Sequence, residues 1–155
     1  QCVFSTSCNA MQKMTIDECI RATRPSSGNA RGVRNKRLYI RNPESFGYIC
    51  QGRKTIEFRL NKGFIRNICK GEFIDVYSPY LDEHVVVHVT KCKLYDGNGE
   101  KKSATTLLRK ALYKKHEQIL PAISDLDNGI DYLKTLYKYT HVIRYGIVLI
   151  HFQVV

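Results

Sequence analysis

The sequence has no apolar stretch long enough to cross a bilayer, and it has few acidic residues. A membrane-spanning helix needs about 20 apolar residues. The longest apolar run here, Tyr145 to Phe152, is strand-sized and is interrupted by His151. Only 14 Asp and Glu stand against 25 Lys and Arg, which gives a formal net charge of +11 at pH 7. We therefore expect no segment that spans a bilayer, and the protein is not an acidic solvating protein. The charge favours a polyanion such as nucleic acid or an anionic membrane surface. Of these two, nucleic acid is the expected partner, and no membrane partner is expected.

Local metal-binding and cofactor-binding patterns are also missing. None of the six cysteines forms a Cys-x-x-Cys pair, which structural zinc sites need, so no metal site is expected. No Ser-His-Asp constellation and no phosphate-binding glycine loop is present, and no cofactor is expected. Cys50 and Cys69 have apolar neighbours in the sequence. They are predicted to be small core residues of an intracellular protein, cytoplasmic or nuclear, in a reducing compartment.

The positive charge is concentrated in two segments. Residues 1–37 carry a net +5 and residues 101–115 a net +6, while the rest of the chain is neutral overall. Residues 1–36 are predicted to be a basic N-terminal arm with one short helix, and residues 37–155 a folded domain. Two concentrated patches suit a phosphate backbone, although a tail and a solvated helix face would give the same pattern. The expected nucleic-acid contacts in the second segment are Lys101, Lys102, Arg109, Lys110, Lys114 and Lys115.

The apolar pattern predicts an α+β domain of about five strands and three or four helices. Strands are predicted at residues 38–41, 55–60, 73–78, 84–95 and 147–154. One helix begins at Asn42-Pro43, a second carries residues 107–115, and a third starts after Gly129. The elements are mixed rather than alternating. We therefore expect a small curled sheet or barrel with helices packed outside it.

The most informative stretch is Gly52-Arg53-Lys54-Thr55-Ile56-Glu57-Phe58-Arg59. It places Lys54 at a helix-to-strand junction, and it places Glu57 and Arg59 two residues apart on one strand, hence on one face. Local geometry alone brings three ionisable groups together. Lys54 is thus a candidate general base or transition-state cation. The alternative is a half-exposed strand with a salt-bridged polar face.

The pattern Gly-x-Lys-x-x-Glu-x-Arg after a short helix resembles the signature of ASCH domains, a family within the PUA-like superfamily. Residues 68–74, with Gly71-Glu72 where the family has Gly-Asp, are similar to its next turn and strand. The segment from Tyr137 to Ile150 is similar to its final helix and strand. The resemblance covers roughly residues 38–153.

The resemblance implies a small PUA-like β-barrel with flanking helices and a cleft for RNA or a nucleobase. Lys54, Glu57 and Arg59 match the family's motif and would line that cleft, and Arg53 and Arg59 are expected to contact nucleic acid. Some members are ribonucleases that use this lysine with a tyrosine on the preceding helix, which Tyr48 matches. Those members also use a late hydroxyl, for which Thr140 is the nearest residue in this sequence.

The resemblance leaves several functions open. The first is an RNA-binding domain, with metal-independent ribonuclease activity centred on Lys54 as its catalytic extension. A ribonuclease of this kind would use Tyr48 as acid or orienting group and Glu57 as base. Members that hydrolyse N4-acetylcytidine have a threonine three residues after the lysine, where this chain has Glu57, which argues against that activity. A non-catalytic protein-interaction or coregulator module is the remaining alternative. The expected partner is RNA or another nucleic acid.

Overall fold

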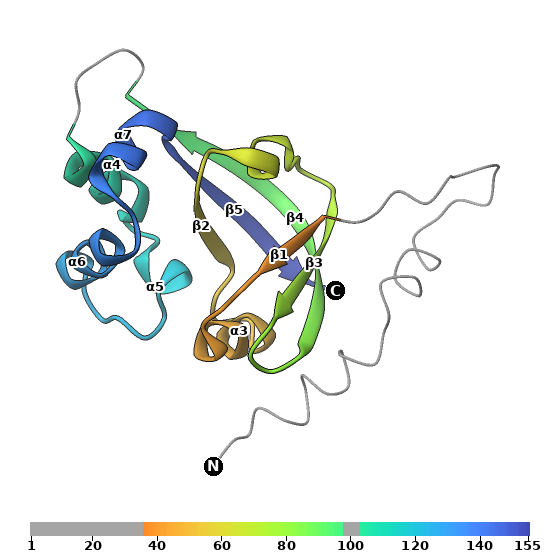
Figure 1. Ribbon diagram of the computed structural model, residues 1–155. Coiled ribbons are helices and arrows are strands. Elements are labelled where there is room, and N and C mark those ends of the chain that lie inside the picture. Colours follow the sequence, from red (N-terminus) through yellow and green to blue (C-terminus); the bar gives the residue numbers. More distant parts are fainter. Residues whose placement is uncertain (1–35, 98–102) are drawn as a thin grey trace.

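The computed structural model describes residues 36–97 and 103–155, which form one five-stranded mixed sheet with helices around it (Figure 1). The strands are arranged in the order β1-β3-β4-β5-β2, so β1 and β2 are the two edges. Within this sheet β1 pairs parallel to β3 and the other pairs are antiparallel. The strands are β1 (Arg37–Tyr39), β2 (Ile56–Leu60), β3 (Phe73–Ser78), β4 (Glu83–Tyr95) and β5 (Ile147–Val154).

Strand β5 separates two hydrophobic cores. Successive side chains of a strand point to opposite faces. Val148 and Ile150 therefore pack on one face, in the cluster that contains residues of α3, whereas Ile147 and Leu149 pack on the other, beneath the C-terminal helices. Because both faces are covered, β5 is almost continuously apolar, as the sequence suggested.

Four helices cover one face of the sheet, and α3 packs against the other (Figure 1). Helix α3 begins at Pro43 because the Oδ1 atom of Asn42 accepts hydrogen bonds from the backbone N–H groups of Glu44 and Ser45. In α4, one stripe of leucine and alanine side chains is buried against the sheet. The helices are α3 (Pro43–Cys50), α4 (Ala104–Leu112), α5 (His116–Ile119), α6 (Leu126–Leu136) and α7 (Tyr139–Tyr145), with a 3₁₀ helix η1 (Gly63–Asn67).

The predicted α+β class and the five strands are confirmed, whereas two helix boundaries were wrong. Helix α4 ends at Leu112, so Lys114 and Lys115 do not lie on it; Lys114 has a φ of 60°, which breaks the helix. Helix α6 begins three residues before Gly129, where the side chain of Asp125 caps it. Gly129 therefore lies inside that helix, where it packs beside the Leu120 side chain; a Cβ atom there would make an ordinary contact with Leu120 at 3.5 Å.

Other predictions were too coarse or lie outside the described residues. The described residues form five α-helices rather than three or four, since the short α5 and α7 carry no repeating apolar pattern. Cys50 is buried as predicted, but Cys69 is exposed because it follows η1 at the surface. The predicted arm, apart from Lys36, and part of the turn at 96–99 lie outside the described residues. No helix in residues 36–97 or 103–155 has the length and hydrophobicity that a bilayer crossing requires.

Candidate ligand-binding cleft

Lys54 is held inside the protein by the turn that joins α3 to β2. The backbone N–H groups of Arg53 and Lys54 both donate to the Tyr48 carbonyl, at 2.9 and 3.0 Å. Gly52 lies in this turn with a φ of 72°, a conformation that favours glycine. Lys54 is 5% exposed, and its Nζ atom donates to the carbonyl of Ile119 at 2.5 Å. The motif therefore buries a cation just before β2.

Glu57 on β2 is the acid that faces this cation. Its Oε2 atom lies 3.6 Å from Nζ of Lys54, and its Oε1 atom accepts a hydrogen bond from Nε of Arg59 at 3.3 Å. Glu57 is 7% exposed, and Oε2 is buried without a hydrogen-bond partner among the described residues. An ionised carboxylate offers about four acceptor positions. Glu57 therefore has acceptor capacity left for a ligand.

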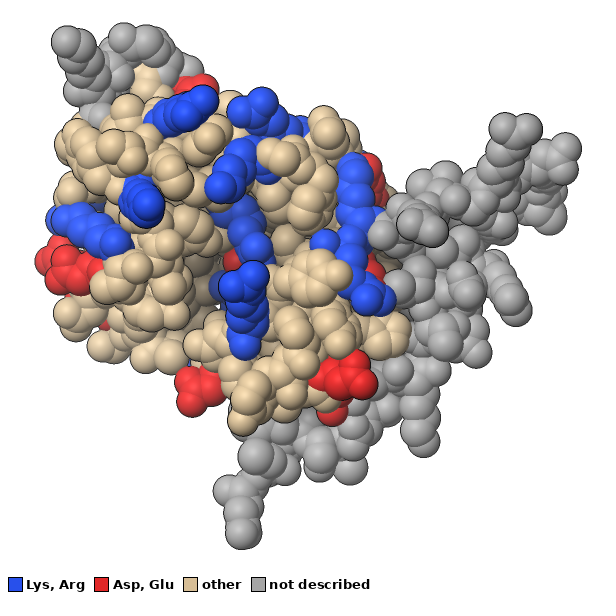
Figure 2. All heavy atoms as spheres, in the orientation of Figure 1, with Lys and Arg blue, Asp and Glu red and all other residues tan. Residues whose placement is uncertain are grey.

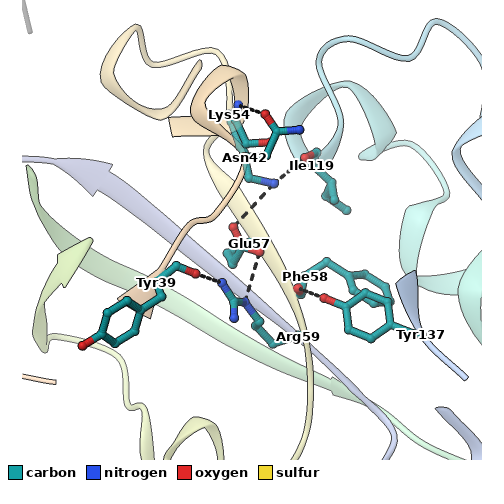
Figure 3. A network of polar contacts seen from close by, with 9 residues as sticks. Tyr39, Asn42, Lys54, Glu57, Phe58, Arg59, Ile119 and Tyr137 are labelled. Atoms are coloured by element: carbon teal, nitrogen blue, oxygen red, sulfur yellow. Dashed lines mark hydrogen bonds and ion pairs between the residues drawn. The ribbon is translucent and has the colours of Figure 1, made fainter. Parts of the chain in front are cut away.

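Arg59 connects the two edges of the sheet. Its Nη2 atom donates to the Tyr39 carbonyl on β1 at 2.6 Å, while its Nε atom donates to Glu57 on its own strand. Strands β1 and β2 are not paired with each other, so the sheet does not close into a barrel. The guanidinium of Arg59 spans the gap between these two edge strands. Figure 3 shows Lys54, Glu57 and Arg59 in one connected network of polar contacts. The sheet is a half-open barrel, and the motif lines its opening.

Tyr137, at the end of α6, forms the facing wall. Its hydroxyl donates to the Phe58 carbonyl at 3.2 Å, and its ring centroid lies 5.2 Å from that of Phe58. Burial, followed by the negative charge of Glu57, raises the pKa of Tyr137 to about 12. The hydroxyl therefore keeps its proton at neutral pH, and it fastens α6 to β2 as a hydrogen-bond donor (Figure 3).

A cleft of about 580 Å³ opens over these groups, between the α3 end of the sheet and helices α5 and α6. Its walls carry three cations and one acid, and α6 adds aromatic and aliphatic surface. Figure 2 shows Lys and Arg side chains along the hollow between the helices and the sheet. The cations are Arg41, Lys54 and Arg59, the acid is Glu57, and the α6 residues include Tyr132, Leu133 and Leu136. This charge balance suits an anionic ligand with a flat or apolar part.

The structure brings Lys54, Glu57 and Arg59 together, but it does not place the two predicted catalytic hydroxyls beside them. The Tyr48 ring lies under the guanidinium of Arg53, 4.6 Å from it, and neither residue lines the cleft. The hydrogen bond between Tyr48 and Lys54 is a backbone one, in which the Tyr48 carbonyl accepts from the Lys54 N–H group. Thr140 is exposed on α7 and does not line the cleft either. Catalytic roles for Tyr48 and Thr140 stay predictions.

The described part of the predicted basic segment, residues 103–115, does not line this cleft. Arg109 forms an exposed ion pair with Asp127 at 2.9 Å. Lys115 donates to the hydroxyl of Tyr95 at 2.6 Å. Burial is the largest influence and acts to raise the pKa of Tyr95, but the hydrogen bonds and positive charges of Lys115 and Lys93 together outweigh it, so the pKa is lowered. Of the other lysines, Lys110 and Lys114 are exposed, and Lys101 and Lys102 lie outside the described residues.

Several cleft residues were not identified from the sequence. Arg41 comes from the link between β1 and α3, and Tyr132 and Leu136 come from α6, far along the chain. Leu136 is the last residue of α6 and Tyr137 follows it, and nothing local in the sequence marks either as a cleft residue. No local signal marks the Tyr39 carbonyl as a partner of Arg59, because any residue offers a carbonyl.

No group of three or more His, Cys, Asp or Glu side chains within residues 36–97 and 103–155 could hold a metal ion. The charged side chains that line the cleft are one carboxylate and three cations. This net positive charge favours an anion over a cation in the cleft.

These features define the class of protein: a small α+β domain with a half-open barrel, whose opening is lined by a buried Lys–Glu–Arg network. Solved structures share this architecture. The hypothetical protein PH0355 superimposes with a TM-score of 0.63 at 21% identity, over 78% of this chain and 99% of the other. A Pyrococcus furiosus protein solved by NMR gives a TM-score of 0.58 at 22% identity, over 78% and 97% of the two chains.

The fold can be named from a further structure. The ASCH domain from Lactobacillus crispatus gives a TM-score of 0.50 at 12% identity, over 77% of this chain and 78% of the other. The chain therefore has the ASCH-type fold that its motif predicted. No protein-family model matches the sequence, and no curated protein matches it either.

Proposed function

We propose that this protein binds single-stranded RNA, and that the cleft over Lys54, Glu57 and Arg59 receives one nucleotide. The observation that carries the proposal is the buried Oε2 atom of Glu57, which is ion-paired with Lys54 at 3.6 Å but accepts no hydrogen bond from the described residues, in a cleft whose other charges are positive. The cations attract phosphate, and a carboxylate accepts hydrogen bonds from the N–H groups of a base. The Tyr132 ring and the Leu136 side chain give the base a surface to pack against.

Binding is favoured over cleavage because only part of a ribonuclease site is assembled. Cleavage without a metal needs a base for the 2′-hydroxyl, an acid for the leaving oxygen and a cation for the phosphorane. Lys54 and Arg59 could serve as the cation, and Glu57 as the base. Among the described residues, four hydroxyl side chains line the cleft, Tyr39, Ser45, Tyr132 and Tyr137; the Tyr137 hydroxyl is bonded to the Phe58 carbonyl, and none of the four is hydrogen-bonded to these three charged side chains. Ribonuclease activity is therefore the catalytic extension of this proposal and is tested with it.

The test measures the affinity for a short fluorescent single-stranded RNA by anisotropy, in EDTA and at several salt concentrations. Arg41 is exposed, lines the cleft and makes no hydrogen bond or ion pair to the described residues, so Arg41→Ala leaves the fold intact. We expect Arg41→Ala to weaken binding about fivefold and to lower the slope of affinity against salt by about 0.7. Lys134→Ala is the matched control, because Lys134 is exposed on α6 and does not line the cleft.

The outcomes separate the alternatives. Equal losses in Arg41→Ala and Lys134→Ala would mean that diffuse charge, not the cleft, holds the RNA, and the proposal would fall. Failure of the wild-type protein to bind RNA would leave the coregulator or amidohydrolase alternatives. RNA that stays intact on a denaturing gel supports a binding domain. Cleavage that disappears in a folded Lys54→Met variant would establish the ribonuclease.

A further inference from the structure

A second cleft adjoins the first one. It measures about 530 Å³ and lies between η1 and the link from α6 to α7. Arg59, Leu136 and Tyr137 line both clefts. Because the two share these walls, they form one groove that passes over Arg59. Each falls within the volume of about 300–1,000 Å³ that is typical of small-molecule sites.

The second cleft is cationic. Lys62 and Lys138 line it from opposite sides, both exposed, and Arg59 stands at the junction with the first cleft. The Nζ atom of Lys62 lies 5.5 Å from the centre of the Tyr145 ring, so the amine makes a cation–π contact with this tyrosine. Among the residues that line the cleft there is no Asp or Glu. Its charge therefore complements a phosphate, and Figure 2 shows that Lys and Arg side chains continue across this face.

The same cleft carries exposed apolar surface. Phe64 is 44% exposed on η1, and Leu136 is 56% exposed at the end of α6. A single exposed apolar side chain is ordinary on a protein surface. Here an aromatic ring and a leucine line a groove whose polar side chains are cations. An aromatic ring beside a cationic track is the arrangement on which unpaired bases stack.

We propose that the second cleft is the subsite for the nucleotide that follows the one in the first cleft. Phe64 stacks on its base, Lys62 and Lys138 bind its phosphate, and Arg59 contacts the phosphate between the two nucleotides. This inference rests on the proposed function and extends it. The ligand is a single strand of two or more nucleotides and not a free nucleoside, since a paired strand could not present two bases to the two clefts.

The experiment compares a mononucleotide with the corresponding dinucleotide by NMR titration of the full chain. Wild-type protein is expected to bind the dinucleotide about tenfold more tightly, with amide shifts around residues 62–65 and 138 only for the dinucleotide. Phe64→Ala and the double variant Lys62→Ala/Lys138→Ala are each expected to remove most of that gain, with the mononucleotide affinity unchanged. Lys134→Ala, which lines neither cleft, should keep the gain.

Each outcome bears on one of the two proposals. Equal affinities for the mononucleotide and the dinucleotide would overturn the second subsite and leave the first cleft as a nucleotide site. A Phe64→Ala variant that loses affinity for both ligands equally would also overturn it. An acidic peptide that binds the second cleft as tightly as the dinucleotide would assign that cleft to a protein partner. If neither nucleotide binds, the proposed function itself fails.

Discussion

The buried carboxylate of Glu57 forms ion pairs with two cations. Lys54 lies on one side and Arg59 on the other, and all three charges are removed from most of the solvent. Burial of an ion pair costs desolvation energy that the attraction offsets only when the geometry is good. The distances of 3.6 and 3.3 Å are long for such pairs, and one oxygen of Glu57 has no hydrogen bond. We infer that the network is kept for ligand binding rather than for stability.

Removing the acid is expected to harm the fold more than removing the lysine. Glu57→Leu leaves Lys54 and Arg59 facing each other without a counter-charge, which should cost about 3 kcal/mol of unfolding free energy. In Lys54→Met the carboxylate still pairs with Arg59, and we expect a loss of about 1 kcal/mol. Urea unfolding of the two variants, and of the double variant Lys54→Met/Glu57→Leu, measures this difference.

The double variant provides the control. It should be more stable than Glu57→Leu alone, because the buried lysine charge is gone. Equal losses in the two single variants would contradict the asymmetric network. Lys54 is itself a buried residue of the folded domain. Its burial and its bond to Ile119 mean that any activity assay of a Lys54 variant needs a folding control.

Among the elements, the link from α7 to β5 is the most constrained. Gly146 has a φ of 73°, and a Cβ atom there would lie 2.9 Å from the carbonyl oxygen of Tyr95 and 3.2 Å from the Cβ of Asp96. The glycine lets α7 turn directly into β5 while the backbone at Gly146 packs against the end of β4. The position of α7, and with it the α6–α7 link of the second cleft, depends on this close approach.

Gly146→Ala is therefore expected to lower the free energy of unfolding by about 3 kcal/mol, because the alanine is strained at this positive φ and its Cβ atom also clashes with the Tyr95 backbone. Gly71→Ala is the matched control: Gly71 has a φ of 92°, but nothing lies within 4 Å of the added Cβ. That variant should lose only about 1 kcal/mol. Thermal unfolding followed by circular dichroism compares them, and equal losses would show that the contact with Tyr95 is unimportant.

Across the whole molecule, the surplus positive charge is divided between residues 1–37 and residues 101–115. Lys36 already belongs to the folded domain, since its Nζ atom lies 2.8 Å from Glu72 and its carbonyl accepts a hydrogen bond from Asp75. This places Lys36 with the domain rather than with the arm predicted for residues 1–36. Residues 1–35 carry five Lys and Arg and two acids.

Deleting residues 1–35 is expected to leave the domain folded and to weaken its RNA affinity. If the segment contacts phosphates, loss of its net positive charge should make the plot of log affinity against log salt less steep by about 2. The melting temperature of the truncated protein checks that the domain is intact. An unchanged salt slope would show that the segment makes no phosphate contact.

Much of the fold could be predicted because its signals are local. The Asn42-Pro43 start of α3, the alternation of β2 and the continuous apolar run of β5 each act through neighbouring residues, and the structure has all three. The end of α4 and the start of α6 could not be predicted in this way. Helix α4 ends where Lys114 takes a φ of 60°, a conformation that a non-glycine residue rarely adopts and that no local pattern indicates, and the cap of α6 by Asp125 competed with Gly129 as the apparent start of that helix.

The sequence by itself determined the three charged residues of the candidate site. The turn geometry puts Lys54 before β2, and strand periodicity puts Glu57 and Arg59 on one face. Only the tertiary structure decided what surrounds them. The gap between the edge strands, the Tyr39 carbonyl, the wall of α6 and the second cleft at Phe64 are contributed by segments far apart in the chain, and only chain folding brings them together.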